Sequence, residues 1–396
     1  MRKPTSRPEF VIHEQPPAVV VVDGQQSREI SPLWLRERTQ APDQLEPMTQ
    51  QRLFDSHAID ANLTLTQATQ VDEQHVALAF SDGHRETYDL RVLAEELGES
   101  ELFPAAEPWD ASLDQNKVRF DWTQVLDDPD VFRESLDAYL RYGYLVLYKV
   151  PTDPERILQV GSHYGYVKET NFGRYFEVYS RPSGNDLAYR SVALGPHTDN
   201  PYRNPVPGIQ LLHCLVNETS GGLSTLVDSL KVLERLRQET PEGYELLKHT
   251  PVRFRFVDAG TQLVTQRTMI QTDDDGRPTG VHYSPRLDGL PLLSDAETRL
   301  FHRARQRLGE LFADPTYEVR FALGAGELML FDNSRVLHGR TSYDSNEGQR
   351  HLQGCYLDTD GPRERFASLL KQHASIEEGR SQPTSATLLE CRRSGH

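Results

Sequence analysis

The chain has 396 residues, of which 37% are hydrophobic and 26% are charged. These values exclude a disordered or collagen-like chain and suggest a soluble globular protein with two domains, or one large core with an appendage. A net charge of −16, from 43 Lys and Arg against 59 Asp and Glu, would repel a phosphate backbone, so we expect no nucleic-acid partner. The negative charge would attract a small cationic ligand, or it simply keeps the protein soluble.

The sparse cysteines favour a reducing compartment. Only Cys214, Cys355 and Cys391 occur, and this odd set predicts no disulfide framework. No apolar run approaches the roughly 18 residues of a membrane span, and the N-terminal segment lacks the apolar stretch of a signal peptide. We therefore expect a cytoplasmic protein with no membrane partner.

The first part of the chain predicts a small β-rich domain over residues 11–98. Apolar runs that end near turn residues predict its strands, at 18–24, 30–35 and 75–80. A helix is expected over 90–97. The acidic, Pro-containing stretch 99–110 is the expected linker.

The second part, residues 110–380, predicts a larger domain of mixed structure. Asp128 and Pro129 begin an expected helix that Gly143 ends, and Ser294 with Glu297 forms a capping box. Apolar runs predict strands at 144–148, 208–214, 252–257 and 327–331. A helix is also expected from Asp153 to Val160. Because irregular loops separate the strands, the pattern favours an α+β fold over a regular βαβ array.

His197-Thr198-Asp199 places an imidazole and a carboxylate two residues apart. On an extended backbone such side chains project to the same side, so both can reach one metal ion. By itself this spacing is weak evidence, since His84-Arg85-Glu86 has the same form.

A second histidine, His338, follows a turn and an apolar run far along the chain. With His197 and Asp199 it would complete the facial triad of non-haem Fe(II) oxygenases, which leaves coordination positions open for substrate and oxygen. Zinc hydrolases use similar ligands, so the three residues leave the metal undecided.

Arg350 begins another expected strand after His338. Its guanidinium could hold the distal carboxylate of a dicarboxylate through two charge-assisted hydrogen bonds while the other end chelates iron. The alternative is an ordinary surface salt bridge.

These residues lie within a longer pattern that resembles one known family. The chain is similar to the γ-butyrobetaine and trimethyllysine hydroxylase branch of the taurine-dioxygenase-like Fe(II)/2-oxoglutarate oxygenases. The matching stretches occur in the family's order across most of 110–380, at 185–189, 195–202, 207–214, 221–228, 331–340 and 350–356.

The resemblance implies a double-stranded β-helix, or jelly roll, with flanking helices. His197, Asp199 and His338 would bind Fe(II), while Arg350 and Ser224 would bind 2-oxoglutarate. The implied reaction consumes 2-oxoglutarate and O2, releases succinate and carbon dioxide, and hydroxylates a substrate. Asp199 favours hydroxylation over halogenation, because halogenating members have a non-coordinating residue there.

The resemblance also implies a pocket for a small zwitterion such as γ-butyrobetaine. An aromatic cage would surround its trimethylammonium group, each good contact contributing about 0.5–2 kcal/mol. The matching rings are Phe172, Phe176, Tyr189 and Tyr356. The family often has Tyr and Trp at the first two of these positions, and Phe is a weaker partner for a cation. The alternative is that the rings merely fill core space.

The acid end of the substrate needs hydrogen-bond donors. The candidates are Asn200 with Tyr202, next to the metal motif, and Arg286. An arginine pairs with a carboxylate but also suits a phosphonate. Related bacterial enzymes hydroxylate trimethylaminoethylphosphonate, so that substrate, another small phosphonate or an amino acid is the alternative. A non-catalytic jelly roll that only binds a ligand is a remote alternative, and Arg286 could equally be an ordinary surface residue.

The N-terminal domain departs from the family. Members commonly bind a zinc ion there through three Cys and one His, near a Trp-Leu-Arg signature that Trp34-Leu35-Arg36 matches. His84 resembles the histidine ligand, but no cysteine precedes Cys214. Because a structural zinc site of this kind needs thiolates, we expect a metal-free domain. We also expect this domain to pack on the catalytic domain or to mediate a homodimer.

Overall fold

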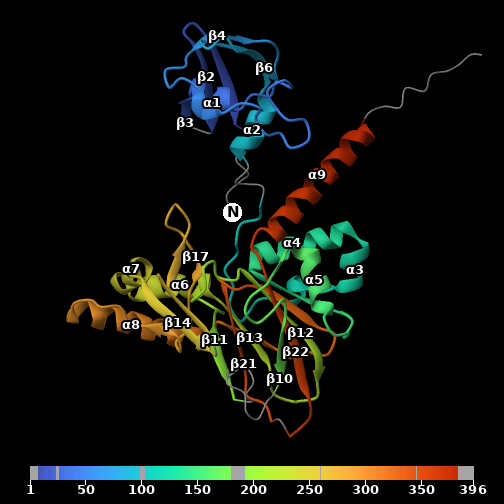
Figure 1. Ribbon diagram of the computed structural model, residues 1–396, viewed down its shortest axis with the longest axis vertical. Helices are drawn as coiled ribbons and strands as arrows, with labels where there is room; N and C mark the ends of the chain where they lie inside the picture. The colour runs from blue at the N-terminus through green and yellow to red at the C-terminus, as the bar shows by residue number, and fades with distance from the viewer. Residues whose placement is uncertain are drawn as a thin grey trace, which may run out of the picture. The chain divides into compact units, whose positions relative to one another are not determined.

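The computed structural model describes residues 8–23, 26–98, 103–179, 192–258, 260–344 and 346–381 (Figure 1). The chain divides into two compact units, Met1–Phe103 and Pro104–His396. Among the described residues, no helix combines the length and the apolar character that crossing a membrane would require.

The first unit contains two antiparallel three-stranded sheets. One sheet has the order β1 (Glu9–Glu14), β2 (Pro17–Asp23) and β3 (Gln26–Glu29). The other has the order β4 (Leu65–Gln70), β5 (His75–Phe80) and β6 (Arg85–Asp89). The helices are α1 (Pro32–Glu37), α2 (Leu90–Gly98) and the short 3-10 helix η1 (Ser56–Ala58). Apolar side chains of both sheets and both α-helices meet in one core. The predicted strand over 75–80 and the predicted helix over 90–97 are confirmed as β5 and α2.

The expected strand over 30–35 is wrong, because α1 occupies most of that segment. The Ser31 hydroxyl accepts the Leu33 N–H at 3.3 Å, and Pro32 stands in the first turn. Serine before proline is a helix-start signal, since the serine caps a free N–H and proline has none to lose. Leu35 is buried in the core of the unit, which explains the apolar character of the run.

The second unit contains the two facing sheets of a jelly roll, so the fold prediction is confirmed. The larger sheet has the order β10-β22-β12-β20-β8-β7, with β9 beside β22, and the smaller has β11-β21-β13-β19. The strands of the larger sheet are β7 (Arg119–Asp121), β8 (Tyr144–Tyr148), β9 (Val167–Lys168), β10 (Phe176–Tyr179), β12 (Ile209–Asn217), β20 (Leu328–Asp332) and β22 (Arg350–Leu357). Those of the smaller are β11 (Leu194–His197), β13 (Ser224–Asp228), β19 (Glu318–Phe321) and β21 (Val336–Arg340).

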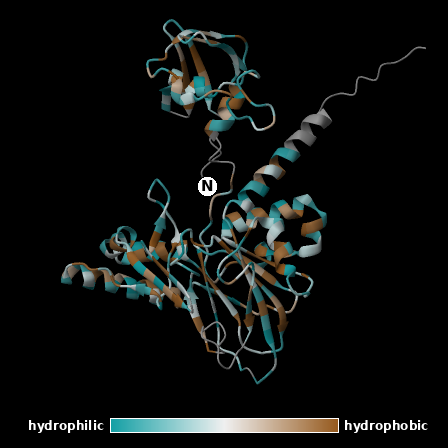
Figure 2. Ribbon diagram, viewed as in Figure 1, coloured by the Kyte–Doolittle hydropathy of each residue, from teal (hydrophilic) through white to brown (hydrophobic). Residues whose placement is uncertain are grey.

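Side chains from the inner faces of both sheets share one core. Cys214, Phe331 and Leu352 come from the larger sheet, and Leu226 and Val336 from the smaller. Since alternate residues of a strand face opposite sides, the intervening residues face the helices outside. Figure 2 shows hydrophobic residues, in brown, along the strands of this unit.

Helices pack on the outer faces of the sheets. Those associated with the larger sheet are η3 (Gln115–Val118), α3 (Trp122–Asp127), α4 (Pro129–Tyr142), α5 (Arg156–Tyr164) and α9 (Gly361–Ser381). The others are α6 (Ser229–Glu239), α7 (Pro241–His249) and α8 (Asp295–Phe312). Their apolar faces share a core with Val227 and Leu337 of the smaller sheet. Short strands complete the unit: β14 (Val252–Asp258), β15 (Thr261–Arg267), β16 (Ile270–Thr272), β17 (Pro278–Val281) and β18 (Asp288–Gly289).

The capping signals of two helices are confirmed. Asp128 caps α4 by accepting the Asp130 N–H, and Gly143 ends the helix at φ 75°. Ser294 and Glu297 form the expected capping box of α8. The helix expected from Asp153 instead begins at Arg156, because Glu155 before it has a left-handed backbone with φ 62°.

Candidate active site

Three potential metal ligands converge at the end of the smaller sheet. His197 ends β11 and lies opposite His338 of β21 in the strand register, so their ring centroids are 4.3 Å apart. Oδ1 of Asp199 lies 3.3 Å from Nε2 of His197 and 3.8 Å from Nε2 of His338. One ligand atom from each residue lies within 4.8 Å of the others, and no other such group of His, Cys, Asp or Glu occurs in the described part of the chain.

The protonation states suit a cation. Burial alone would raise the pKa of Asp199, but the hydrogen bond with His197 and the proximity of both histidines lower it below its ordinary value. Burial, with the charge of His197, lowers the pKa of His338 to about 3. At neutral pH the site therefore presents an ionised carboxylate and a neutral His338 imidazole. Nδ1 of His197 lies 3.0 Å from the Gly195 carbonyl oxygen, a contact that leaves Nε2 for the metal.

The donor set fits Fe(II). Two imidazoles and one carboxylate form the facial arrangement of non-haem iron oxygenases, in which the remaining positions are open. Asp199 is fixed further by Tyr356, whose hydroxyl donates to Oδ2 at 2.8 Å. This leaves Oδ1, the oxygen nearest the two histidines, as the metal-facing atom.

Arg350 is buried at the start of β22, with 7% of its surface exposed. Its Nη2 donates to the Gly222 carbonyl at 3.4 Å, and its guanidinium lies 5.5 Å from the centroid of the Tyr343 ring. Burial, with the nearby charge of Arg340, lowers the pKa of Arg350 to about 10. No ion pair with Arg350 occurs among the described residues, so its burial disagrees with the surface salt-bridge alternative. A buried cation of this kind favours an incoming anion.

Ser224 of β13 lies on the inner side of the smaller sheet, two residues before Leu226 of the shared core. It is 2% exposed and faces Arg340 across the β13–β21 pair. Directly opposite residues in an antiparallel pair project to the same face, so the hydroxyl and the Arg340 side chain share one side of the sheet. The arrangement can present a hydroxyl and guanidinium groups to one carboxylate.

Several predicted pocket rings form a continuous group beside the metal site. The Tyr356 and Phe176 centroids are 5.2 Å apart, and those of Phe176 and Phe172 are 6.4 Å apart. Because Tyr356 also contacts Asp199, this group begins at one of the three potential metal ligands. Tyr189 lies outside the described residues.

Sequence reasoning missed two members of this group. Phe256 of β14 lies 6.2 Å from Phe172 and stacks on Tyr202 at 4.7 Å with a 14° interplanar angle. The guanidinium of Arg203 lies 5.6 Å from the Phe172 centroid and 5.7 Å from that of Tyr202, and also bonds to Asn171. The alternation of β14 indicated a strand at Phe256, but no local signal indicated where its ring would go.

The residues predicted to bind the acid group of the substrate differ in their exposure to solvent. Asn200 is 8% exposed, and its Nδ2 has no hydrogen-bond partner among the described residues, while its Oδ1 accepts the Tyr202 hydroxyl at 2.5 Å. Arg286 is exposed, yet its charge contributes, after burial and His197, to the lowered pKa of His338. Asn200 thus offers a buried donor beside Asp199, and the charge of Arg286 reaches the metal site.

The first unit uses a carboxylate where the family resemblance places a metal. Glu86 is 6% exposed at its side chain and accepts the Thr39 hydroxyl at 2.6 Å and the Gln40 N–H at 2.5 Å. Nε2 of His84 lies 2.8 Å from the same carboxylate. The residues present therefore do not fit the thiolate zinc site, because a glutamate already joins the loop after α1 to β6.

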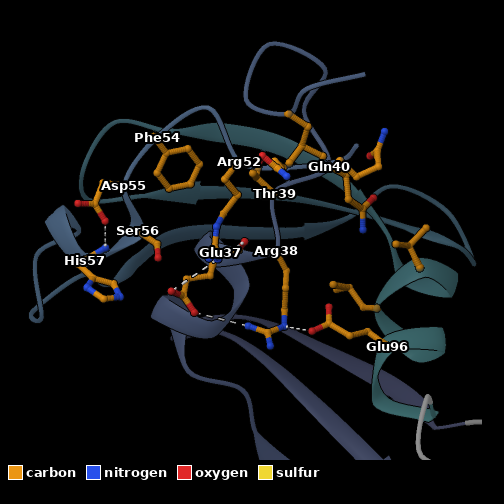
Figure 3. A pocket seen from close by; sticks show the side chains of 15 residues that line it. Glu37, Arg38, Thr39, Gln40, Arg52, Phe54, Asp55, Ser56, His57 and Glu96 are labelled. Atoms are coloured by element: carbon orange, nitrogen blue, oxygen red, sulfur yellow. Dashed lines mark hydrogen bonds and ion pairs between the residues drawn. The ribbon is translucent and has the colours of Figure 1, made fainter. Parts of the chain in front are cut away.

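The first unit also has an open pocket of about 940 Å³, lined by α1, α2 and the 45–57 segment (Figure 3). Four of its charged side chains form ion pairs with one another. Arg38 lies 2.6 Å from Glu96, and Arg52 lies 3.6 Å from Glu37. Nothing in this lining identifies a ligand.

Comparisons with known proteins agree with this geometry. Residues 101–356 match the family described as taurine catabolism dioxygenase TauD, TfdA family, and residues 15–94 match the γ-butyrobetaine hydroxylase-like N-terminal domain. A γ-butyrobetaine dioxygenase of Pseudomonas sp. (strain AK-1) is 33% identical over 336 residues, covering 83% of this chain and 87% of that protein. A trimethyllysine dioxygenase of Meyerozyma guilliermondii is 27% identical over 366 residues, covering 85% and 90%.

Among solved structures, a taurine dioxygenase from Burkholderia xenovorans matches with a TM-score of 0.44 and 17% identity, covering 64% of this chain and 93% of that one. With a facial His-Asp-His group in place and the family match spanning most of the chain, this protein belongs to the TauD/TfdA family and is an Fe(II)- and 2-oxoglutarate-dependent dioxygenase.

Proposed function

We propose that this protein hydroxylates a small quaternary-ammonium zwitterion, with γ-butyrobetaine as the first candidate. The observation that carries the proposal is the group of rings that begins at Asp199, because ring faces are the usual protein partners of a trimethylammonium group. The names of the γ-butyrobetaine and trimethyllysine dioxygenases that the chain resembles support the same substrate class.

In this proposal His197, Asp199 and His338 hold Fe(II), and Arg350 with Ser224 binds the distal carboxylate of 2-oxoglutarate. Bound Fe(II) supplies the O2 chemistry that converts 2-oxoglutarate to succinate and carbon dioxide and hydroxylates the substrate. Arg350 and Ser224 lie on the inner faces of the sheets, away from bulk water. This strengthens their hydrogen bonds to the carboxylate of 2-oxoglutarate.

Phe176 and Tyr356 are the proposed partners of the substrate's cation, with Phe172 and Tyr189 completing the cage. Arg203 already lies against Phe172, and two cations close together repel each other. The substrate's cation therefore binds on the Phe176 and Tyr356 side of the group. Asn200, Tyr202 and Arg286 receive the acid end.

We also propose that residues 11–98 and 110–380 are the functional domains of a cytoplasmic homodimer. The dimer follows the expectation that the N-terminal domain mediates association, and the buried free thiols of Cys214 and Cys355 suit a reducing compartment. Sedimentation of the full chain at micromolar concentration tests the dimer, and a monomer would contradict it.

The test is succinate formation by anaerobically iron-loaded protein after O2 is admitted, with mass spectrometry of the second product. γ-Butyrobetaine, trimethyllysine and trimethylaminoethylphosphonate are compared at equal concentration. We expect hydroxylated γ-butyrobetaine in step with succinate. Preference for the phosphonate would change the acid group assigned, and stimulation by none of the three would contradict the cage.

A further inference from the structure

Asp199 is the only anionic member of the metal group, and its backbone is held by a single side chain from elsewhere in the chain. The Asp199 N–H donates to Oδ1 of Asn333 at 2.7 Å, and Nδ2 of Asn333 donates back to the Asp199 carbonyl at 2.9 Å. Nδ2 also donates to the Pro207 carbonyl at 2.9 Å. Asn333 is completely buried, so these bonds have no competition from bulk water.

We propose that Asn333 is a positioning residue for the metal, which fixes the Asp199 carboxylate in its ligating orientation. This inference rests on the proposed role of His197, Asp199 and His338 as the Fe(II) site. An amide is suited to the task because it presents a donor and an acceptor side by side, matching the N–H and C=O of one residue.

The position of Asn333 in the chain links the two halves of the metal site. It lies in the tight turn between β20 and β21, five residues before His338. Oδ1 of Asp332 accepts the N–H groups of Ser334 and Arg335 at 2.8 and 3.1 Å and stiffens this turn. A displacement of Asn333 would therefore move Asp199 relative to His338.

The other side of the His197–Asp199 segment is fixed independently. The Thr198 N–H donates to the Tyr283 carbonyl at 2.8 Å, and the Tyr283 N–H donates to the Thr198 hydroxyl at 3.0 Å. With Thr198 bound on one side and Asn333 on the other, the backbone around Asp199 has little freedom. Tyr356 then holds Oδ2 and leaves Oδ1 for the metal.

The consequence is a metal site whose affinity depends on a residue that does not touch the metal. Outer hydrogen-bonding partners of metal ligands typically change metal affinity by about 10–100-fold when removed. Asn333→Ala removes three bonds at once, so the Asp199 carboxylate gains orientations in which Oδ1 points away from the histidines.

The experiment compares anaerobic Fe(II) binding by wild-type apoprotein, Asn333→Ala and Gln353→Ala, with circular dichroism to confirm folding. Gln353 is a matched control because it is 1% exposed and its amide also bonds in both directions, to the Glu155 N–H and the Glu177 carboxylate, in the other sheet. We expect Asn333→Ala to weaken Fe(II) binding at least tenfold and Gln353→Ala to reduce thermal stability without changing Fe(II) affinity.

A folded Asn333→Ala protein that binds Fe(II) as tightly as the wild type would overturn the inference, as would an equal loss of affinity in Gln353→Ala. Failure of the wild type to bind Fe(II) would instead contradict the metal site itself. If Asn333→Ala does not fold, Asn333→Ser carries the same criterion, because a single hydroxyl cannot replace all three bonds of the amide. The ratio of succinate to hydroxylated product is the second readout, and we expect it to rise when Asp199 is loosened.

Discussion

The guanidinium of Arg335 makes a two-bond contact with the carboxylate of Asp228, from Nε to Oδ1 at 3.1 Å and from Nη2 to Oδ2 at 2.9 Å. The side chains are 4% and 0% exposed. Arg335 also donates to the Arg141 and Glu107 carbonyls, and Asp228 accepts the Trp109 N–H and caps α6 through the Leu230 N–H. The pair thereby joins the start of β21, which carries His338, to α4 and α6.

Replacing Asp228 with Asn should destabilise the protein by about 3–5 kcal/mol, because Arg335 would remain buried without a counter-charge. Urea unfolding measures the loss. Asp275→Asn is the control, since its ion pair with Arg277 is 67% and 74% exposed and should contribute less than about 1 kcal/mol. A loss at Asp228 no larger than that of the control would contradict the structural role of the pair.

Arg350→Ala should raise the 2-oxoglutarate concentration needed for half-maximal succinate formation by at least tenfold, since the cosubstrate would lose its charged partner. Gly222→Ala should act in the same direction. A Cβ there would lie 2.9 Å from Nε of Arg350, and the φ of +66° disfavours any side chain.

Titration of the absorption of the iron-bound cosubstrate under anaerobic conditions measures this affinity. Gly83→Ala, at another positive-φ glycine with no atom within 4 Å of the added Cβ, controls for backbone strain. An unchanged 2-oxoglutarate requirement in Arg350→Ala would remove Arg350 from its proposed role.

Arg203→Gln should change the substrate preference of the enzyme. The guanidinium lies against Phe172 and Tyr202, so its removal frees ring surface and lowers the positive charge near Asn200. We expect the KM for γ-butyrobetaine to rise severalfold, because its acid end loses an attractive charge. The KM for an analogue with an alcohol in place of the acid should stay the same or fall. Parallel changes for both compounds would show that Arg203 has only a structural role.

The protein should lose stability in acid partly through His213. This histidine of β12 is fully buried, neither ring nitrogen has a partner among the described residues, and burial lowers its pKa from 6.5 to about 4. Between pH 6.5 and pH 4 the unfolded chain therefore binds more protons at His213 than the folded chain does. The contribution of neutral His213 to the free energy of unfolding is fully present above pH 6.5 and decreases as the pH falls toward 4.

Between pH 7 and pH 5 the protonation of His213 lowers the free energy of unfolding by about 2 kcal/mol. His213→Leu should reduce the difference in unfolding free energy between those two pH values by that amount, as measured by urea titration at each. His249→Leu, at an exposed helix position, is the control. An identical pH dependence in His213→Leu and the wild type would contradict the assignment.

Glu86→Gln should destabilise the first unit by about 1–3 kcal/mol, because the carboxylate accepts hydrogen bonds from Thr39 and Gln40 that an amide serves less well. Hydrogen exchange at residues 39–40 and 84–89 locates the effect, and exposed Glu29→Gln is the control. Elemental analysis of the same protein measures its zinc content. One zinc ion per chain, bound in the first unit, would contradict the proposed role of the Glu86 carboxylate.

Local sequence patterns predicted the parts of this protein that depend on neighbouring residues. The helix start at Asp128, the capping box at Ser294 and the His197–Asp199 spacing are all set within a few residues along the chain. The segment 30–35 shows the limit of such reasoning, because its apolar run suits a strand while Ser31 and Pro32 start a helix.

The sequence, through motifs that resemble a known family, indicated the jelly-roll class and the residues of the His-Asp-His group. Only the tertiary structure decided that Phe256 and Arg203 join the predicted rings, and that Asn333 holds Asp199. These contacts depend on which strands are neighbours and in which register, and a shift of one residue would turn every side chain of a strand to its opposite face. Such long-range pairing is a property of the whole sheet, so no short stretch of the chain contains it.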